Sequence, residues 1–284
     1  GKDALGTSVD GNFNTALGYK ALEDYEDGAG NGHNTAVGAS SQLNASTGEF
    51  NTSLGSLSIG SGVTTGNYNT AVGYQSGRDQ SSGTENTFLG AHSGMKVSTG
   101  GHNVGVGMQT MQNTTVGHKN TAIGTYALFT NVDSSQNVAV GFEALRVLEP
   151  ASAVNSLNVA VGYQAGRLMT TGIRNTLIGP LAGDALTTGT RNVAIGMSAL
   201  SAEDAHGFNV AIGNSALAVQ NAGDNAYNVA VGYTAGAAIT TGVNNVIMGG
   251  LAGDALTTGS FNVAIGYNAL GLEDAHGKNT AIGW

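Results

Sequence analysis

A five-residue motif, Asn-(Thr/Val)-x-aliphatic-Gly, recurs sixteen times along the 284 residues and limits what the chain can fold into. Most successive copies lie 17 residues apart, and the other intervals are 18 to 21 residues long. A fixed period of this length is typical of repeat architectures, in which each unit buries its apolar residues only against its neighbours. The sequence therefore predicts a stack of similar coils. The repeated asparagines are Asn14, Asn34, Asn51, Asn69, Asn86, Asn103, Asn120, Asn137, Asn158, Asn175, Asn192, Asn209, Asn228, Asn245, Asn262 and Asn279.

The residue types of the motif indicate a short β-strand. The position after the asparagine is always Thr or Val, and two positions later stands Val, Ile, Leu or Met. Side chains alternate between the two faces of a strand. We therefore expect these branched residues to fill the interior of each coil. The Asn, Ala and Gly positions should form a flat opposite face that could seat a neighbouring chain.

The two invariant positions should each have a structural role. Asparagines stacked at the same place in every coil would form a ladder, their amides bonding to neighbouring coils or to turn backbone. The glycine would supply a positive φ or room for neighbouring backbone. Representative copies are Asn69 with Gly73, Asn158 with Gly162, Asn192 with Gly196, and Asn262 with Gly266.

A second short element is expected after each glycine, because the third residue beyond it is Ala, Ser or Thr in all fifteen complete copies. A variable loop follows, often Thr-Thr-Gly, and this loop would absorb the extra residues of the longer intervals. The off-period copy Asn113-Thr-Thr-Val-Gly117 is assigned to such a loop. Each unit thus has two short strands and two turns.

We predict an all-β fold, a parallel β-solenoid of about sixteen 17-residue coils. Residues 1–13 would be an incomplete leading coil, and residues 14–284 one continuous solenoid domain. The chain starts without Met and stops inside a repeat, so we interpret it as a segment of a longer fibre.

Composition excludes several classes of protein. A net charge of -9 without any Lys/Arg run argues against nucleic-acid binding. Forty-six glycines without a three-residue period, together with only 2 prolines, exclude collagen. The absence of cysteine excludes disulfides and thiolate metal sites. The sequence contains no stretch of eighteen apolar residues, so no membrane-spanning helix is predicted.

No catalytic, cofactor-binding or metal-ligating residue is predicted. The histidines form no His-x-His or His-x-x-x-His pair, and we interpret them as loop residues. The acidic pairs 23–24, 203–204 and 273–274 recur with the coil. A catalytic carboxylate set is needed once, with distinct neighbours that tune its pKa, so we interpret these pairs as solvated loops. The histidines are His33, His92, His102, His118, His206 and His276.

An interrupted series of aromatic residues stands directly after the glycine. Tyr74, Tyr163, Tyr233 and Tyr267 are its main members, with others at positions 19, 142 and 284. Such residues could stack on sugars of a glycan, or they could pack between chains or over the coil corner.

The copies Asn-Val-Ala-Ile-Gly at 192–196, 209–213 and 262–266 resemble the repeated signature of trimeric autotransporter adhesin heads. The copies at 69–74 and 158–163, Asn-(Thr/Val)-Ala-Val-Gly-Tyr, with Thr-Thr-Gly loops, are even more similar to phage tail-fibre shafts. The resemblance covers residues 14–284. It implies left-handed parallel β-rolls, with three chains side by side sharing an apolar interface.

Together, the residues and the resemblance predict a structural or adhesive shaft segment of a trimeric extracellular, cell-surface or virion fibre that mediates attachment to a cell surface. Its partners would be two copies of itself and a cell-surface receptor or glycan, without nucleic acid or any cofactor. The alternative is a monomeric β-solenoid enzyme that acts on polysaccharide, although we expect no enzymatic activity.

Overall fold

The computed structural model describes residues 1–7, 11–26, 32–60, 62–149 and 154–284. The contacts within the chain divide into two compact units, one built mainly on residues 1–137 and the other mainly on residues 138–284. Each unit is a parallel β-solenoid, so the predicted fold class is confirmed. The described residues include no helix that could cross a membrane.

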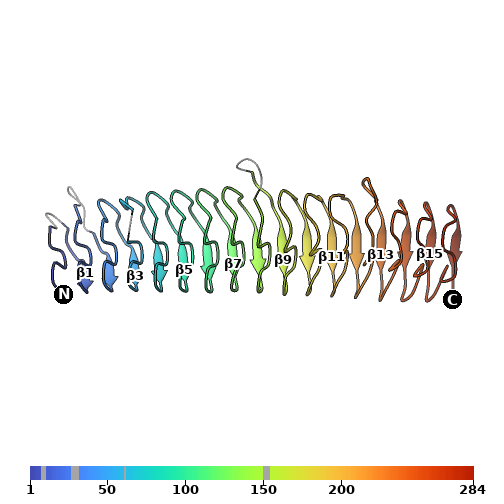
Figure 1. Cartoon of the computed structure of the whole chain (residues 1–284), viewed down its shortest axis with the longest axis horizontal. Helices are drawn as coiled ribbons and strands as arrows, with labels where there is room; N and C mark the ends of the chain where they lie inside the picture. Colours follow the sequence, from blue (N-terminus) through green and yellow to red (C-terminus); the bar gives the residue numbers. More distant parts are fainter. Residues whose placement is uncertain (8–10, 27–31, 61, 150–153) are drawn as a thin grey trace. The chain divides into compact units, whose positions relative to one another are not determined.

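Each coil contributes one three-residue strand, and successive strands pair in parallel within each unit (Figure 1). The first unit holds β1 (Thr15–Leu17), β2 (Thr35–Val37), β3 (Thr52–Leu54), β4 (Thr70–Val72), β5 (Thr87–Leu89), β6 (Val104–Val106) and β7 (Thr121–Ile123). The second unit holds β8 (Val138–Val140), β9 (Val159–Val161), β10 (Thr176–Ile178), β11 (Val193–Ile195), β12 (Val210–Ile212), β13 (Val229–Val231), β14 (Val246–Met248), β15 (Val263–Ile265) and β16 (Thr280–Ile282). Equivalent residues are paired at each step, so the register follows the sequence repeat.

The predicted second strand is wrong, because the segment after each glycine is a turn. Positive φ angles recur two and four residues beyond the glycine, as at Gln75 (54°) and Gly77 (58°), whereas a strand needs negative φ. The backbone N–H of Gln75 donates to Ser56 in the preceding coil, and that of Gly77 donates to Ser93 in the following coil. The turn therefore bonds to both of its neighbours.

The predicted orientation of the strands is also wrong. The middle strand residue points inward, and Ala71 and Ala194 are completely buried. The flanking residues Val193 and Ile195 are half-buried on the outer side. The interior of the coil is narrow, so the strand side that faces the turn has room only for small side chains at most steps. The branched residues occupy the outside instead.

Larger side chains fill the interior from two alternative positions of the turn and, in β5, β10 and β14, from the middle of the strand as well. In one coil Leu200, four residues after Gly196, is completely buried. In the coil before it, the equivalent residue is Gly183, and Leu186 three residues later takes the space. A Cβ on Gly183 would lie 2.7 Å from a methyl carbon of Leu186. In these two coils the large apolar side chain of the turn therefore comes from one position or the other, and the core stays filled.

The predicted asparagine ladder is present in both units. The backbone N–H of each asparagine donates to the side-chain Oδ1 of the preceding one, as from Asn69 to Asn51 and from Asn192 to Asn175, both at 2.9 Å. This bond is found at each step from Asn14 to Asn137 and from Asn158 to Asn279. The asparagines inside each unit are buried, so these bonds are shielded from water.

The asparagine amide also closes its own coil. The Nδ2 of Asn158 donates to the carbonyl of Gly172, and that of Asn262 donates to the carbonyl of His276, at 2.8 and 3.1 Å. In each case the acceptor lies three residues before the next ladder asparagine. Gly117, at the end of the off-period copy, is such an acceptor for Asn103, so the assignment of that copy to a loop is confirmed.

The invariant glycine has both predicted properties. Its φ lies between 125° and 145° in every coil, for example 130° at Gly73, 141° at Gly162 and 128° at Gly266. A Cβ at this position would collide with the glycine carbonyl of the next coil at each copy from Gly18 to Gly107 and from Gly141 to Gly266. Only glycine meets both requirements.

Replacing Asn192 with Ala should lower the free energy of unfolding by about 2–6 kcal/mol. The buried N–H of Asn209 and the carbonyl of His206 would both lose their partner, and each orphaned group costs about 1–3 kcal/mol. Asn214→Ala removes only a local acceptor for the Ser215 hydroxyl, so it should change the free energy of unfolding by about 0.5 kcal/mol or less. Urea denaturation of both variants measures the difference, and equal effects would contradict a structural ladder.

Gly249→Ala should destabilise the protein by about 3–5 kcal/mol, because its φ is 132° and a Cβ would overlap the Gly266 carbonyl. The next residue supplies a matched control. A Cβ on Gly250 would lie 3.7 Å from the Tyr267 ring, an ordinary contact, so Gly250→Ala should be close to neutral. The thermal unfolding midpoints of the two variants test this contrast.

Candidate functional site

The candidate functional surface is the outer side of the strands, where large hydrophobic side chains are exposed. We call the first and third residues of all strands the outward face. It is flanked by the corner column, the residue directly after each glycine, and the leading column, the residue directly before each asparagine. All but four of the exposed large hydrophobic side chains among the described residues belong to these positions. The four exceptions are Val63, Leu168, Val219 and Leu272.

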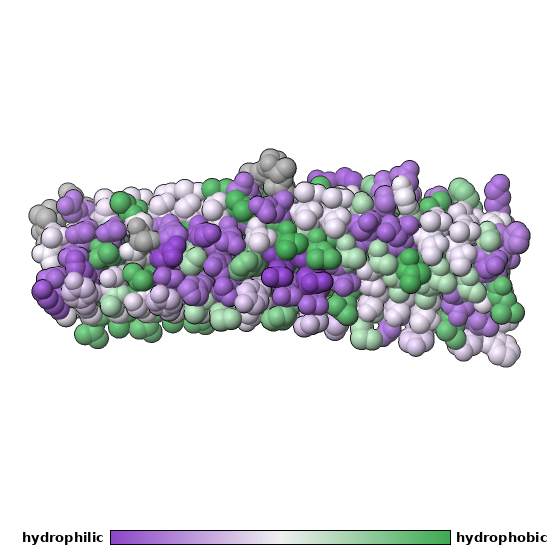
Figure 2. Space-filling view, viewed as in Figure 1, coloured by the Kyte–Doolittle hydropathy of each residue, from purple (hydrophilic) through white to green (hydrophobic). Residues whose placement is uncertain are grey.

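The outward face is apolar and uncovered in the single chain. Leu54 and Leu89 in the first unit are 48% and 47% exposed, and Met248 in the second is 42% exposed. In Figure 2 hydrophobic side chains line the lower edge of the first unit, where the strands of Figure 1 end. Parallel sheets are normally covered on both faces. Here the chain covers only the inner one.

The corner column carries the aromatic residues singled out in the sequence, and all of them are exposed. Tyr163 is 51% exposed and stacks on Phe142, with ring centroids 5.7 Å apart. Tyr74 meets the ring of His92 edge-on at 5.3 Å. Tyr233 and Tyr267 are 62% and 55% exposed, with Gly250 at the equivalent position of the coil between them. These rings extend the outward face on one side.

An aromatic ladder in the leading column escaped the sequence reasoning. Phe13, His33, Phe50 and Tyr68 stack on one another in the first unit, with centroids 4.9 to 5.0 Å apart and ring planes within 9° of parallel. Glu85 and His102 continue the column, with a carboxylate oxygen of Glu85 3.0 Å from the ring Nδ1 of His102. The available signal was the aromatic residue directly before several of the asparagines. The side chains of the leading column could be placed next to one another only once the residue before each asparagine was known to point outward.

The leading column of the second unit holds a second, shorter stack. Phe208 and Tyr227 lie 5.0 Å apart, and the guanidinium of Arg191 lies 5.2 Å from the Phe208 ring. Every leading-column residue has a positive φ, from 51° at Tyr227 to 65° at Phe208. The ring contacts offset part of the cost of this backbone conformation.

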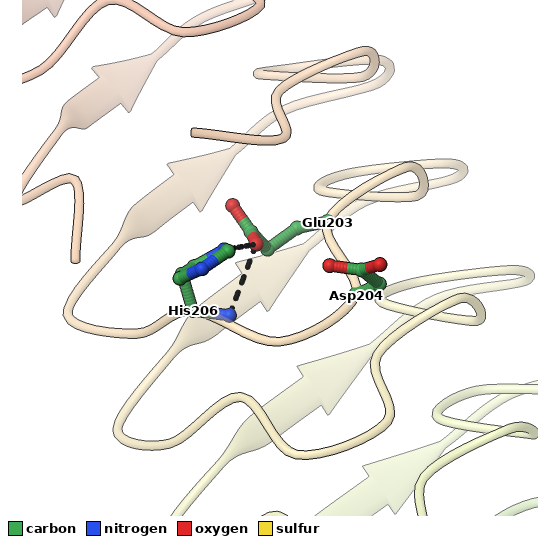
Figure 3. A group of neighbouring side chains, drawn as sticks. All are labelled: Glu203, Asp204 and His206. Carbon is green, nitrogen blue, oxygen red and sulfur yellow. Dashed lines mark hydrogen bonds and ion pairs between the residues drawn. The ribbon is translucent and has the colours of Figure 1, made fainter. Parts of the chain in front are cut away.

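Two clusters of acidic residues and histidine lie in the loops of the second unit. Glu203, Asp204 and His206 form one, and residues 273, 274 and 276 form its copy. Glu203 is completely buried; one of its oxygens accepts the backbone N–H of His206 at 3.1 Å and lies 3.0 Å from the His206 ring (Figure 3). Its other oxygen accepts a hydrogen bond from Gln220 at 3.4 Å. The carboxylate is therefore engaged in closing its own loop.

The second copy of this cluster has the same geometry in a more exposed setting. Glu273 accepts the backbone N–H of His276 at 2.9 Å and lies 2.8 Å from its ring nitrogen. These hydrogen bonds lower the pKa of the Glu273 carboxyl below its ordinary value. The Glu-x-x-His spacing was the sequence signal for this contact. Recurrence with the coil agrees with a role in loop structure.

Comparison with known proteins adds no relative: no family model matches the chain, and no curated protein matches it.

Replacing Phe50 with Ala should destabilise the first unit by about 1–3 kcal/mol more than Phe261→Ala destabilises the second. Phe50 stacks on both His33 and Tyr68, and each ring pair contributes about 0.5–1.5 kcal/mol. Phe261 has the same column position and a similar φ, 60° against 57°. Thermal unfolding of the two variants measures the difference, and equal losses would show that the ladder adds nothing to stability.

Proposed function

We propose that this chain is a shaft segment of a homotrimeric fibre in which three copies lie side by side and cover one another's outward faces. The observation that carries the proposal is the uncovered apolar face of a parallel sheet, repeated at each strand of both units. Apolar surface of this extent on a soluble monomer is unusual and marks an interaction site. Copies of the same solenoid present matching apolar rows at the same spacing.

The proposal differs from the sequence-based one in the surface that it uses. The small Asn and Ala side chains expected to seat a neighbour are inside the coil, and the motif glycines before the last are half-buried at its corner. The outward face has no charged residue at either of its two positions, which removes the cost of desolvating charge on association. Interface cores are generally depleted of charged residues in the same way.

We further propose that the fibre is extracellular, on a cell surface or on a virion, and that it attaches to a cell-surface receptor or glycan. The resemblance to adhesin heads and tail-fibre shafts supports this part. A repeat that adds one equivalent coil after another lengthens a spacer without altering its surface chemistry. Aromatic residues of the corner column, such as Tyr233 and Tyr267, remain candidates for contact with sugars.

The alternative proposal, a monomeric enzyme acting on polysaccharide, needs one carboxylate set in a distinct environment. The loop carboxylates that lie close to a histidine, Glu203 and Glu273, are two copies of one arrangement four coils apart, and each is hydrogen-bonded to the histidine of its own loop. This recurrence favours the structural proposal.

Sedimentation equilibrium of the purified chain tests the assembly directly. The expected mass is three times 28.3 kDa, and it should persist at high salt because the face is apolar. A monomer at all concentrations would overturn the proposal. Release of sugars from a panel of polysaccharides would support the enzymatic alternative instead.

A further inference from the structure

Threonine and valine are unevenly distributed over the first position of the strands. In the first unit this position is Thr in every strand except β6, and in the second unit it is Val in every strand except β10 and β16. Both residues are β-branched and of similar shape, so a strand accepts either one. The division therefore bears on what the outward face contacts.

Burial under an apolar partner surface has opposite energetic effects on threonine and valine. Thr52 and Thr87 are exposed, where water can bond their hydroxyls, and a covering surface would remove that water. Burying a hydroxyl without a new partner is unfavourable, whereas burying the methyl groups of valine is favourable. The same apolar cover thus fits the second unit better than the first.

The third strand position is apolar in both units: it is Val, Ile or Met in the second unit and Leu, Val or Ile in the first. No residue of the outward face or corner column is charged in either unit. The units differ again in the corner column, which in the second unit carries the large exposed side chains Phe142, Tyr163, Met197, Tyr233 and Tyr267. The corresponding column of the first unit contains Ala39, Ser56, Ala91 and Thr125 among its seven members.

The extent of this patch suits a stable interface. Nine strands at about 4.8 Å spacing, each presenting about four residues or 13 Å of width, give a flat footprint on the order of 600 Å². Protruding side chains make the accessible area larger than the footprint. A standard stable interface buries about 800 Å² per partner.

We infer that copies of this chain associate mainly through the outward face and corner column of the second unit, residues 138–284, and that the threonine-bearing outward face of the first unit contributes less to the interface. This inference rests on the proposed homotrimer and locates its interface. The occupant is another copy of the chain, because it offers the same uncharged rows at the same spacing. Each coil then adds an equivalent contact.

Exchange of the two residue types tests the inference in the full chain. In one variant Val193, Val210 and Val229 become Thr; in the matched variant Thr35, Thr52 and Thr70 become Val. Each variant carries at its strands the residue that the other unit already tolerates, so both should fold. The valine-to-threonine variant should raise the dissociation constant of the assembly by roughly a hundredfold or more, and the reverse variant should not raise it.

A second pair of variants places a charge at the same position in each unit. Val210→Lys and Thr70→Lys both change the half-buried first residue of a strand with the same burial pattern. Val210→Lys should give monomers, whereas Thr70→Lys should keep the wild-type mass. Circular dichroism and thermal unfolding check that each variant is folded.

The outcomes separate this inference from the proposed function. A monomeric wild-type chain would overturn both. A wild-type assembly that both lysine variants weaken equally, or that only Thr70→Lys dissociates, would overturn the location while leaving the homotrimer intact. Analytical ultracentrifugation over a concentration series distinguishes these results.

Discussion

The hydrogen bond from each ladder asparagine to the Oδ1 of the preceding one is the interaction on which the coil repeat depends. A strand of three residues forms few backbone hydrogen bonds with the strands of the neighbouring coils, so each coil needs further hydrogen bonds to its neighbours. The asparagine supplies them: its backbone N–H donates to the preceding coil, its side-chain Oδ1 accepts from the following coil, and its Nδ2 donates to its own loop. Extra residues are accepted in the loops because the ladder position itself is kept. Asn209 departs from the pattern in its longer coil: its Nδ2 has no partner among the described residues, and Gln220 donates to its Oδ1.

Invariant glycine and inward alanine follow from the narrow space around that ladder. The glycine carbonyl of one coil lies where a Cβ of the preceding coil's glycine would be, and alanine is the usual size that fits between strand and turn. The branched residues are consequently on the outside, where a single chain leaves them partly exposed. An interior made of small residues and an apolar exterior are thus two results of one constraint.

The two units meet this constraint with different chemistry. In the first unit the third residue after the glycine is often Ser or Thr, and neighbouring hydroxyls bond to one another, as between Ser93 and Thr110 at 2.8 Å. In the second unit the same position is Ala throughout, for example at Ala199 and Ala216, and the outward face changes from Thr to Val. Hydroxyl groups are therefore used inside and outside the first unit. Aliphatic groups replace them at both positions of the second.

The sequence by itself determined the repeat, the position of each strand, the asparagine ladder and the conformation of the glycine, because each depends on local residue types at a fixed period. It did not determine which side of the strand faces inward, because alternation gives two faces without naming the inner one. Nor could it reveal that the segment after the glycine is a turn, or that Phe13, His33, Phe50 and Tyr68 form a stack. Those features depend on how the coil closes in space, which turns Ala71 inward and leaves Val72 half-buried on the outer side.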